Sequence, residues 1–333
     1  MDYTHLAGLI NDFTGYDITM SGKRPSPFSI SMPLGGDSDA ATGKAFANTK
    51  LNIDRVYYQG VDLQNIKVPV TIQGGVARAK VNATLNGGTL SLAPSLKLTG
   101  NKMLSLPDNS TVFTNVALTS ALVNESLVQI HPMLKDSAVT SGKIHMDINR
   151  FRKSLADDRA APELAGVLRF ESTVLTPGGV VGRSLELAQV NVRNIHIVST
   201  NINFHIENDR LYTSPLIFST GKSTLRFEGS TSLDGDLDYY VVIPITPKLV
   251  GGGSTYEKLK DDSIRIPIKG RSGKEILDHK GFTRELMRLT YKAEAKERVN
   301  KELDRLKDKL GSDEIKDKLG DEAGKILEGI FNR

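Results

Sequence analysis

The stretch NIHIVSTNINFHIENDRLYTSPLIFSTGKSTLRFEGSTSLDGDLDYYVVIPI, residues 194–245, decides the fold class of this chain. Apolar and polar residues alternate through several short runs, as at Ile202, Phe204 and Ile206. A period of two places one set of side chains on one face of a pleated strand. Turn-forming pairs separate the runs: Asn208-Asp209, Gly221-Lys222 and Asp234-Gly235. The stretch therefore predicts an antiparallel meander with one apolar face.

The same alternation recurs outward from this stretch. It is strong from Phe46 to Leu98 and returns at 112–118, 143–148, 166–174 and 264–268. The phase changes between Ile53 and Val56, which predicts a bulge. Pro69 lies within a strand run and has no N–H to donate, so we expect this strand to be an edge strand or to carry a bulge.

Other segments lack the period of two. Helical spacing predicts a short helix over 3–13, a helix of three to four turns over 120–135 that Pro132 bends or ends, and a short helix over 183–191. Composition predicts loops at 35–43, 150–163 and 251–253. From Lys274 onward Lys, Glu, Asp, Leu and Ala dominate, which predicts one long helix followed by shorter ones. We divide the chain into an N-terminal helix and loop (1–45), a β-domain (46–270) with an inserted helix near 120–135, and a charged amphipathic helical tail (271–333).

Composition excludes several classes of function. The 333 residues contain no cysteine, so disulfides, thiolate catalysis and cysteine metal sites are excluded. A net charge of +4, spread evenly, gives no argument for nucleic acid as a partner. No apolar run reaches the roughly 20 residues of a spanning helix, and no leader pattern opens the chain. We therefore expect either a cytosolic protein or the C-terminal part of a longer chain, and the family resemblance described below favours the second.

The candidate chemical motifs are weak. Asp234, Asp236 and Asp238 lack the glycine and glutamate that an EF-hand loop needs, so a hairpin turn explains them better. Residues 270–275, GRSGKE, lack the spacing of a phosphate-binding loop. His145 shares a strand face with Asp147, and His205 shares one with Asn203, but neither pair has a third ligand at metal spacing. We therefore expect no enzyme, no cofactor and no metal.

The predicted fold class is mainly β with α: a large curved antiparallel sheet, repeating and groove-like, with a few short helices and a long C-terminal helical tail. The apolar faces of so many strands must be hidden. A closed sheet or a two-sheet sandwich would hide them, and so would a long curved sheet whose concave side is covered by lipid. The pattern does not choose between these arrangements.

The order of motifs from about Val112 to Lys269 resembles the C-terminal region of the AsmA-like family of envelope proteins, which includes TamB-type proteins. The segments that carry the resemblance are SLVQIHPML (126–134), SGKIHMDI (141–148), LAGVLRFESTVLTPGGV (164–180), INFHIENDRLYTSPLIFSTGKSTLRFEGSTSLDGDLDYYVVIPI (202–245) and IRIPIKG (264–270). Residues 60–94 resemble a preceding repeat. Asn208-Asp209 stands where a glycine usually follows the strand in this family.

The resemblance implies a periplasmic β-groove in the cell envelope of a Gram-negative-type bacterium, within a protein anchored in the inner membrane. It implies phospholipid binding and transport and a part in outer-membrane assembly. The partners would be lipid acyl chains, and the C-terminal helices would contact a membrane surface or an envelope protein. Nucleic acid is not among the expected partners.

Our first hypothesis is accordingly a non-catalytic groove that binds or conducts lipid acyl chains. Its lining would be the apolar strand residues Ile66, Val68, Val70, Ala79, Val81, Ile144, Met146, Leu168, Phe170, Phe204, Ile206, Leu225, Phe227, Val241 and Ile243. The alternative is a structural or assembly scaffold of the envelope whose helical tail recruits a partner. A third possibility, an enzyme acting on carbohydrate, would need two carboxylates facing each other across a cleft, and the sequence offers no such pair.

Overall fold

The computed structural model describes residues 17–22, 25–33, 38–157 and 159–309, together with Tyr3, Thr4, Ala7 and Asn11. These residues fall into two compact units. The first contains the described residues of 1–244 and 265–278, and the second those of 245–264 and of 279 onward. The two units interleave along the chain.

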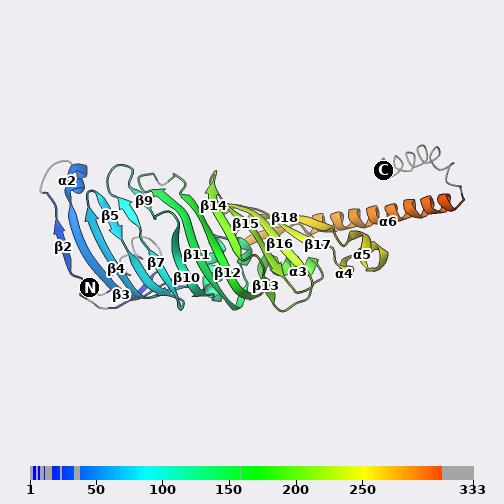
Figure 1. The fold of residues 1–333 in the computed structure, drawn as a ribbon, viewed down its shortest axis with the longest axis horizontal. Helices are drawn as coiled ribbons and strands as arrows, with labels where there is room; N and C mark the ends of the chain where they lie inside the picture. The colour runs from blue at the N-terminus through cyan, green and yellow to red at the C-terminus, as the bar shows by residue number, and fades with distance from the viewer. Residues whose placement is uncertain are drawn as a thin grey trace. The chain divides into compact units, whose positions relative to one another are not determined.

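One large antiparallel sheet of 19 strands dominates the structure, which confirms the predicted fold class. The long strands bend along their length (Figure 1). The strands are β1 (Thr19–Ser21), β2 (Phe28–Ser31), β3 (Phe46–Tyr58), β4 (Val61–Gln73), β5 (Val76–Ala79), β6 (Val81–Leu85), β7 (Gly88–Leu92), β8 (Ser95–Lys97), β9 (Met103–Ser105), β10 (Ser110–Ala117), β11 (Ala138–Ser154), β12 (Glu163–Thr176), β13 (Ile195–Ile197), β14 (Asn201–Glu207), β15 (Arg210–Ser219), β16 (Thr224–Ser232), β17 (Leu237–Pro244), β18 (Ser263–Arg271) and β19 (Lys274–Leu277).

The strands follow one another across the sheet in chain order. β3 pairs with β4, β11 with β12, β15 with β16, and β16 with β17, each in the antiparallel direction. Several short strands share one row: β5 and β6 both pair with β4, and β13 and β14 both pair with β12. β1 and β2 lie along the same side of β3. Such a meander needs only short connections between neighbouring rows.

The phase change predicted between Ile53 and Val56 is present. Ile53 is buried, the next two residues are exposed, and Val56 packs against the core formed by Tyr3, Met20 and Ile66. The bulge predicted from this phase change is not found in the β3–β4 pair, since Ile53 stays opposite Ile66 and Val56 stays opposite Leu63; the register irregularity lies between β4 and β6, at Gln64–Lys67. Asn65 adopts a left-handed conformation (φ 53°) at the irregularity. Asparagine tolerates this conformation better than most residues.

Pro69 was expected to mark an edge strand or a strand with a bulge; the edge alternative is wrong, whereas β4 does carry a register irregularity against β6, between Gln64 and Lys67. β4 lies inside the sheet, between β3 and the row of β5 and β6. The Pro69 carbonyl accepts a hydrogen bond from Lys80 N at 3.1 Å, but Pro69 has no N–H to return. The neighbouring row is interrupted at Lys80, between β5 and β6. The absence of an N–H at Pro69 therefore interrupts the neighbouring row between β5 and β6, while β4 itself stays continuous.

The segments between strands differ from prediction in three places. Residues 38–44 form helix α2 (Ser38–Lys44) within the expected loop. Residues 122–134 form three short turns, Leu122–Ser126, Leu127–Gln129 and Pro132–Leu134, and not one regular helix. Apolar side chains on several sides of this segment are buried. A regular amphipathic helix would bury apolar side chains on one side only. The two ends of the expected loop over 150–163 belong to β11 and β12, because Arg152 and Glu163 are strand partners.

Two helix predictions lie closer to the structure. A short helix was predicted over 183–191, and helix α3 spans Gly179–Leu187. Of the helix predicted over 3–13, Tyr3, Thr4, Ala7 and Asn11 are described and are helical, while the remainder lies outside the described residues.

The second unit is helical. It contains α4 (Pro247–Val250), α5 (Gly253–Leu259) and the long helix α6 (His279–Lys309), drawn in orange in Figure 1. Lys258 Nζ of α5 donates a hydrogen bond to Glu297 Oε2 of α6 at 2.6 Å, and Lys301 Nζ lies 2.7 Å from Glu297 Oε1. These cations lower the pKa of Glu297 to about 2. The shorter helices predicted after α6 lie outside the described residues.

The tail predicted from residue 271 begins later than expected, because Lys274–Leu277 is strand β19 and pairs with β18. Within the described part of the chain, no helix has both the length and the apolar character to cross a membrane.

Candidate functional site

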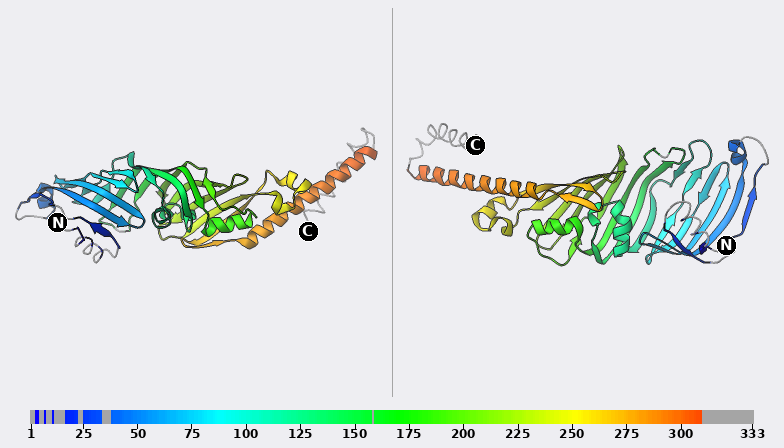
Figure 2. Two further views of the ribbon diagram at one scale, coloured as in Figure 1. Left: turned by 90° about the horizontal axis from the view of Figure 1, so that it is seen from below. Right: turned by 180° about the vertical axis from the view of Figure 1, so that it is seen from behind.

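The sheet of the first unit has an inner face that carries most of the apolar strand residues and an outer face that carries the polar ones. Figure 2 shows from behind that α3 and the turns of 122–134 lie against the sheet. Inner-face residues meet across neighbouring strands, as Val70 does with Ala79 and Ile144 with Phe170. The apolar face predicted from alternation is therefore continuous from strand to strand.

Part of the inner face is covered poorly, and we call this part the apolar stripe. Its members are side chains of β2–β12 that lie next to one another by strand register and keep access to solvent. They are Phe28, Ile30, Ala47, Leu51, Val68, Val70, Ile72, Ala77, Ala79, Leu96, Leu104, Phe151 and Leu164. Phe28 and Ile30 are 78% and 67% exposed, and the others are half-buried. Lys153, opposite Leu104, borders the stripe and donates a hydrogen bond to the Ala160 carbonyl.

The inner face of β15–β17 is covered completely. Leu216, Phe218, Phe227, Val241 and Ile243 have no measurable exposure. Phe218 and Phe227 pack edge to face, with ring centroids 5.8 Å apart. This end of the sheet is a packed core.

The predicted lining residues divide between these two environments. Those that remain half-buried are Val68, Val70, Ala79, Val81, Met146 and Ile206. Those that are buried are Ile66, Ile144, Leu168, Phe170, Phe204, Leu225, Phe227, Val241 and Ile243. Val68, Val70 and Ala79 belong to the apolar stripe, so the structure brings together the predicted residues of the first strands on a surface that a ligand could reach.

Sequence reasoning missed several members of the stripe. Phe151 fell within the segment 150–163, which was interpreted as a solvated loop because of its charged residues and alanines, and Leu164 lay between that segment and the strand predicted from Gly166. Phe28 and Ile30 fell in a short predicted strand with no stated side. Their alternation with polar residues was the available signal, and register with Thr49 and Ala47 places them on the inner face.

The turns of 122–134 and helix α3 cover the last strands. Met133 and Leu134 of the turns and Val180, Val181 and Leu185 of α3 are buried. His131 lies against Tyr239 of β17, with ring centroids 5.5 Å apart, and Tyr239 shares a hydrogen bond with Thr213 at 3.3 Å. Arg183 of α3 donates a hydrogen bond from Nη2 to the Glu275 carbonyl of β19 at 3.1 Å.

His131 is buried, and among the described residues neither of its ring nitrogens has a hydrogen-bond partner. Burial lowers the pKa of this imidazole to about 3, because the charged form would lose its hydration. The covering segment thus holds a neutral histidine in its core.

The covering turns are fixed by side chains of their own segment. Asn124 Nδ2 donates to the Ser120 and Ser137 carbonyls at 2.9 Å each, and Asn124 Oδ1 accepts from Asp136 N at 2.6 Å. Ser126 Oγ donates to the Gln59 carbonyl at 2.6 Å, which ties the turns to the β3–β4 hairpin. Gly60 is required in that hairpin, because a Cβ there would lie 2.4 Å from the backbone of Ala121 and Leu122.

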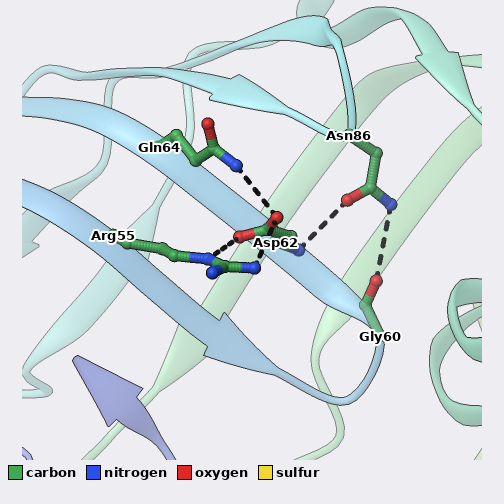
Figure 3. A network of polar contacts seen from close by, with 5 residues as sticks. All are labelled: Arg55, Gly60, Asp62, Gln64 and Asn86. Atoms are coloured by element: carbon green, nitrogen blue, oxygen red, sulfur yellow. Dashed lines mark hydrogen bonds and ion pairs between the residues drawn. The ribbon is translucent and has the colours of Figure 1, made fainter. Parts of the chain in front are cut away.

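A polar network joins this hairpin to the turn between β6 and β7 (Figure 3). Arg55 binds both carboxylate oxygens of Asp62, at 2.6 and 3.0 Å, and Gln64 Nε2 donates to Asp62 at 3.0 Å. Asn86 Oδ1 accepts from Asp62 N at 3.2 Å, while Asn86 Nδ2 donates to the Gly60 carbonyl. The hydrogen bond from Arg55 holds the pKa of Asp62 below its usual value. We interpret this network as structural.

The outer face of the later strands is built from paired charges. Arg226 and Arg265 both lie 3.2 Å from Glu228, and Arg265 also stacks over the Tyr240 ring at 4.1 Å. Arg271 lies 2.8 Å from Asp236, and Lys269 pairs with Asp238. The aspartates considered as calcium ligands are thus partly engaged in ion pairs around a turn at Gly235 (φ 92°).

The histidine pairs noted in the sequence also have ordinary partners. His145 Nε2 lies 3.1 Å from Glu171 Oε2, Asp147 pairs with Arg169, and His205 stacks on Tyr212 with centroids 5.4 Å apart. Across the described residues, no group of three His, Asp or Glu side chains is placed to hold a metal ion.

Comparison of the chain with protein-family models, with curated proteins and with solved structures gave no match.

Proposed function

We propose that the apolar stripe binds lipid acyl chains and that the protein is an AsmA-like module of the cell envelope. The observation that carries the proposal is the half-buried state of Leu51, Val70, Ile72 and Ala79 on an inner face that is otherwise packed. Strand register places these side chains on one surface. Strand β2 adds to the same surface, because its residues lie opposite Thr49 and Ala47 of β3.

An acyl chain lying across the strands would complete the burial that the polypeptide leaves unfinished. Each methylene group removed from water contributes about 0.8 kcal/mol, so a chain covering the stripe has a strong hydrophobic drive. The polar head group would stay in water at an edge of the stripe. No covalent step and no cofactor is required.

The resemblance to AsmA-like proteins supports the same function and supplies its context. On this proposal the protein works in the periplasm, contributes to phospholipid transport and outer-membrane assembly, and belongs to an assembly anchored in the inner membrane.

The test compares two double variants of matched chemistry. Val70→Gln/Ala79→Gln places amides on the stripe, at two residues that face each other in the register. Thr71→Gln/Asn48→Gln places the same amides on the outer face, again at register partners. Both variants should retain the circular dichroism spectrum and melting behaviour of the original protein.

Purified protein is extracted, and its lipids are quantified by mass spectrometry and by displacement of a fluorescent phospholipid. We expect bound phospholipid in the original protein and in the outer-face variant, and a more than tenfold loss of affinity in the stripe variant. Absence of lipid from the original protein together with no binding of the fluorescent phospholipid would overturn the proposal.

A second candidate function is a non-catalytic scaffold whose helical tail binds a partner. Met287 and Tyr291 favour it, because they lie one turn apart on α6 and are 56% and 70% exposed. A scaffold needs no lipid on the stripe, so the lipid measurement separates the two candidates.

A further inference from the structure

The outer face of the first strands carries an unusual charge distribution. Lys50 of β3, Lys67 of β4, Arg78 of β5, Lys80 beside it and Lys97 of β8 are all exposed. We call these residues the basic face. Within the described part of the chain none of the five has an ion pair or a side-chain hydrogen bond, in contrast to the paired charges of β16–β18.

Strand register places these cations close together. Lys50 is directly opposite Pro69, and Lys80 N donates to the Pro69 carbonyl from the other side. Lys67 precedes Pro69 by two residues on the same face and is therefore diagonal to both lysines. Arg78 lies opposite Thr71, and Lys97 lies opposite Val76 in the next row. Diagonal neighbours in a sheet are within reach of long side chains.

Like charges at this spacing repel each other, and in the described part of the chain strand register places no acidic residue between them. The residues between the cations are neutral: Asn48, Pro69, Thr71, Asn82 and Ser95. An anionic partner would remove the repulsion and make use of all five cations at once. Charge complementarity therefore identifies the partner as anionic and extended in two dimensions.

We propose that the basic face docks the first strands of the sheet onto an anionic phospholipid bilayer. Lysines act as flexible point charges and need no fixed geometry in the partner, which suits a fluid array of head groups.

Nucleic acid fits this face less well. Proteins that bind single strands on a sheet stack bases on aromatic side chains, and the positions between the cations hold no aromatic residue. The proposal goes beyond lipid binding by the apolar stripe and does not rest on it, because the two surfaces lie on opposite faces of the sheet.

The test measures co-sedimentation of the full chain with vesicles of phosphatidylcholine alone and of phosphatidylcholine with 30% phosphatidylglycerol, at low and at high salt. The variant Lys67→Glu/Arg78→Glu/Lys80→Glu changes the basic face. The control Arg193→Glu/Lys222→Glu/Lys274→Glu makes the same change in net charge at exposed residues elsewhere in the first unit. The stripe variant Val70→Gln/Ala79→Gln reports on the other face.

We expect binding only to the anionic vesicles, weakened by salt because the attraction is electrostatic. Each cation near such a surface contributes about fivefold to the affinity, so the basic-face variant should lose on the order of a hundredfold. The control and the stripe variant should stay within about threefold of the original protein. If the stripe variant loses bound lipid but still binds anionic vesicles, membrane docking by the basic face is distinguished from acyl-chain binding by the apolar stripe.

Four results would overturn the proposal. The first is no preference for anionic vesicles, and the second is an equal loss in the basic-face variant and the control. The third is binding of a labelled single-stranded oligonucleotide that depends on the basic face while vesicle binding is absent. A vesicle interaction that survives in the basic-face variant would place the contact on another surface and would also overturn it.

Discussion

The first strands of the sheet, β2–β8, and the last, β15–β18, follow the same alternation but have different surroundings. On the inner face, Val70 and Ala79 stay half-buried, whereas Phe227 and Val241 are fully covered. On the outer face, Lys50 and Lys67 have no partner among the described residues, whereas Lys269 and Arg271 pair with aspartates.

Side chains of the last strands make their contacts within the protein, whereas side chains of the first strands leave apolar surface and charges without contacts among the described residues. Around the last strands, apolar groups are covered by the turns of 122–134 and α3, and charges are neutralised across strands. The first strands leave apolar side chains open on one face and cations unpaired on the other. Since unfinished surfaces of this kind stabilise a protein poorly, we interpret them as binding surfaces.

The largest effect should come from removing buried volume at the last strands. We expect Phe227→Ala to lower the free energy of unfolding by about 3–5 kcal/mol, because the ring leaves a cavity beside Phe218 that cannot close. Val70→Ala removes less volume and opens no closed cavity, so its cost should be below about 1 kcal/mol. Urea unfolding followed by circular dichroism checks both. Equal losses would contradict the contrast between the two regions.

A pH effect of intermediate size should come from the covering turns. The pKa of His131 falls from 6.5 in the unfolded chain to about 3 in the fold, so the unfolded state binds the proton first as pH decreases. Stability should be fully present above pH 6.5 and lost progressively between pH 6.5 and 3, by roughly 1.4 kcal/mol per pH unit at most.

Thermal unfolding at pH 7.5, 6 and 5 measures this loss, with His131→Leu as the variant that cannot titrate. The variant should show a flatter profile over this range. Asp62 and Asp147, whose pKa values are lowered by hydrogen bonds from Arg55 and Arg169, should contribute only at more acidic pH. Parallel profiles for the variant and the original protein would show that His131 is accessible to protons in the fold.

The smallest effects should come from single charges on the outer face, and they should differ in sign. Lys269→Gln removes an exposed ion pair with Asp238 and should lower stability slightly. Lys67→Gln relieves repulsion from Lys50 and Lys80 and should raise stability slightly. Chemical denaturation at low salt resolves such differences, and high salt should reduce both. A destabilising Lys67→Gln would show that this lysine has a favourable contact.

Local patterns predicted much of the fold. The phase change between Ile53 and Val56 and a helix near α3 were visible in the sequence, because each depends on neighbouring residues. Errors arose where the deciding contact was distant. Pro69 was expected to mark an edge strand or a bulge, yet its effect falls on Lys80 in the next row. The segment 122–134 lacks a regular helix because its surroundings bury it on several sides.

The candidate site could be predicted only in part. Alternation identified Val68, Val70 and Ala79 as inner-face residues, and the structure keeps them accessible. The same rule also selected Phe227 and Val241, which are buried. Alternation reports which face a side chain joins, and it carries no information on what covers that face.

The sequence by itself determined that this protein is a long antiparallel meander with one apolar and one polar face, because side-chain alternation is a property of each strand alone. Only the tertiary structure decided where the apolar face is closed and where the cations lack partners. Coverage and charge pairing depend on segments that are brought together by folding, and here His131 and α3 reach strands that lie far along the chain.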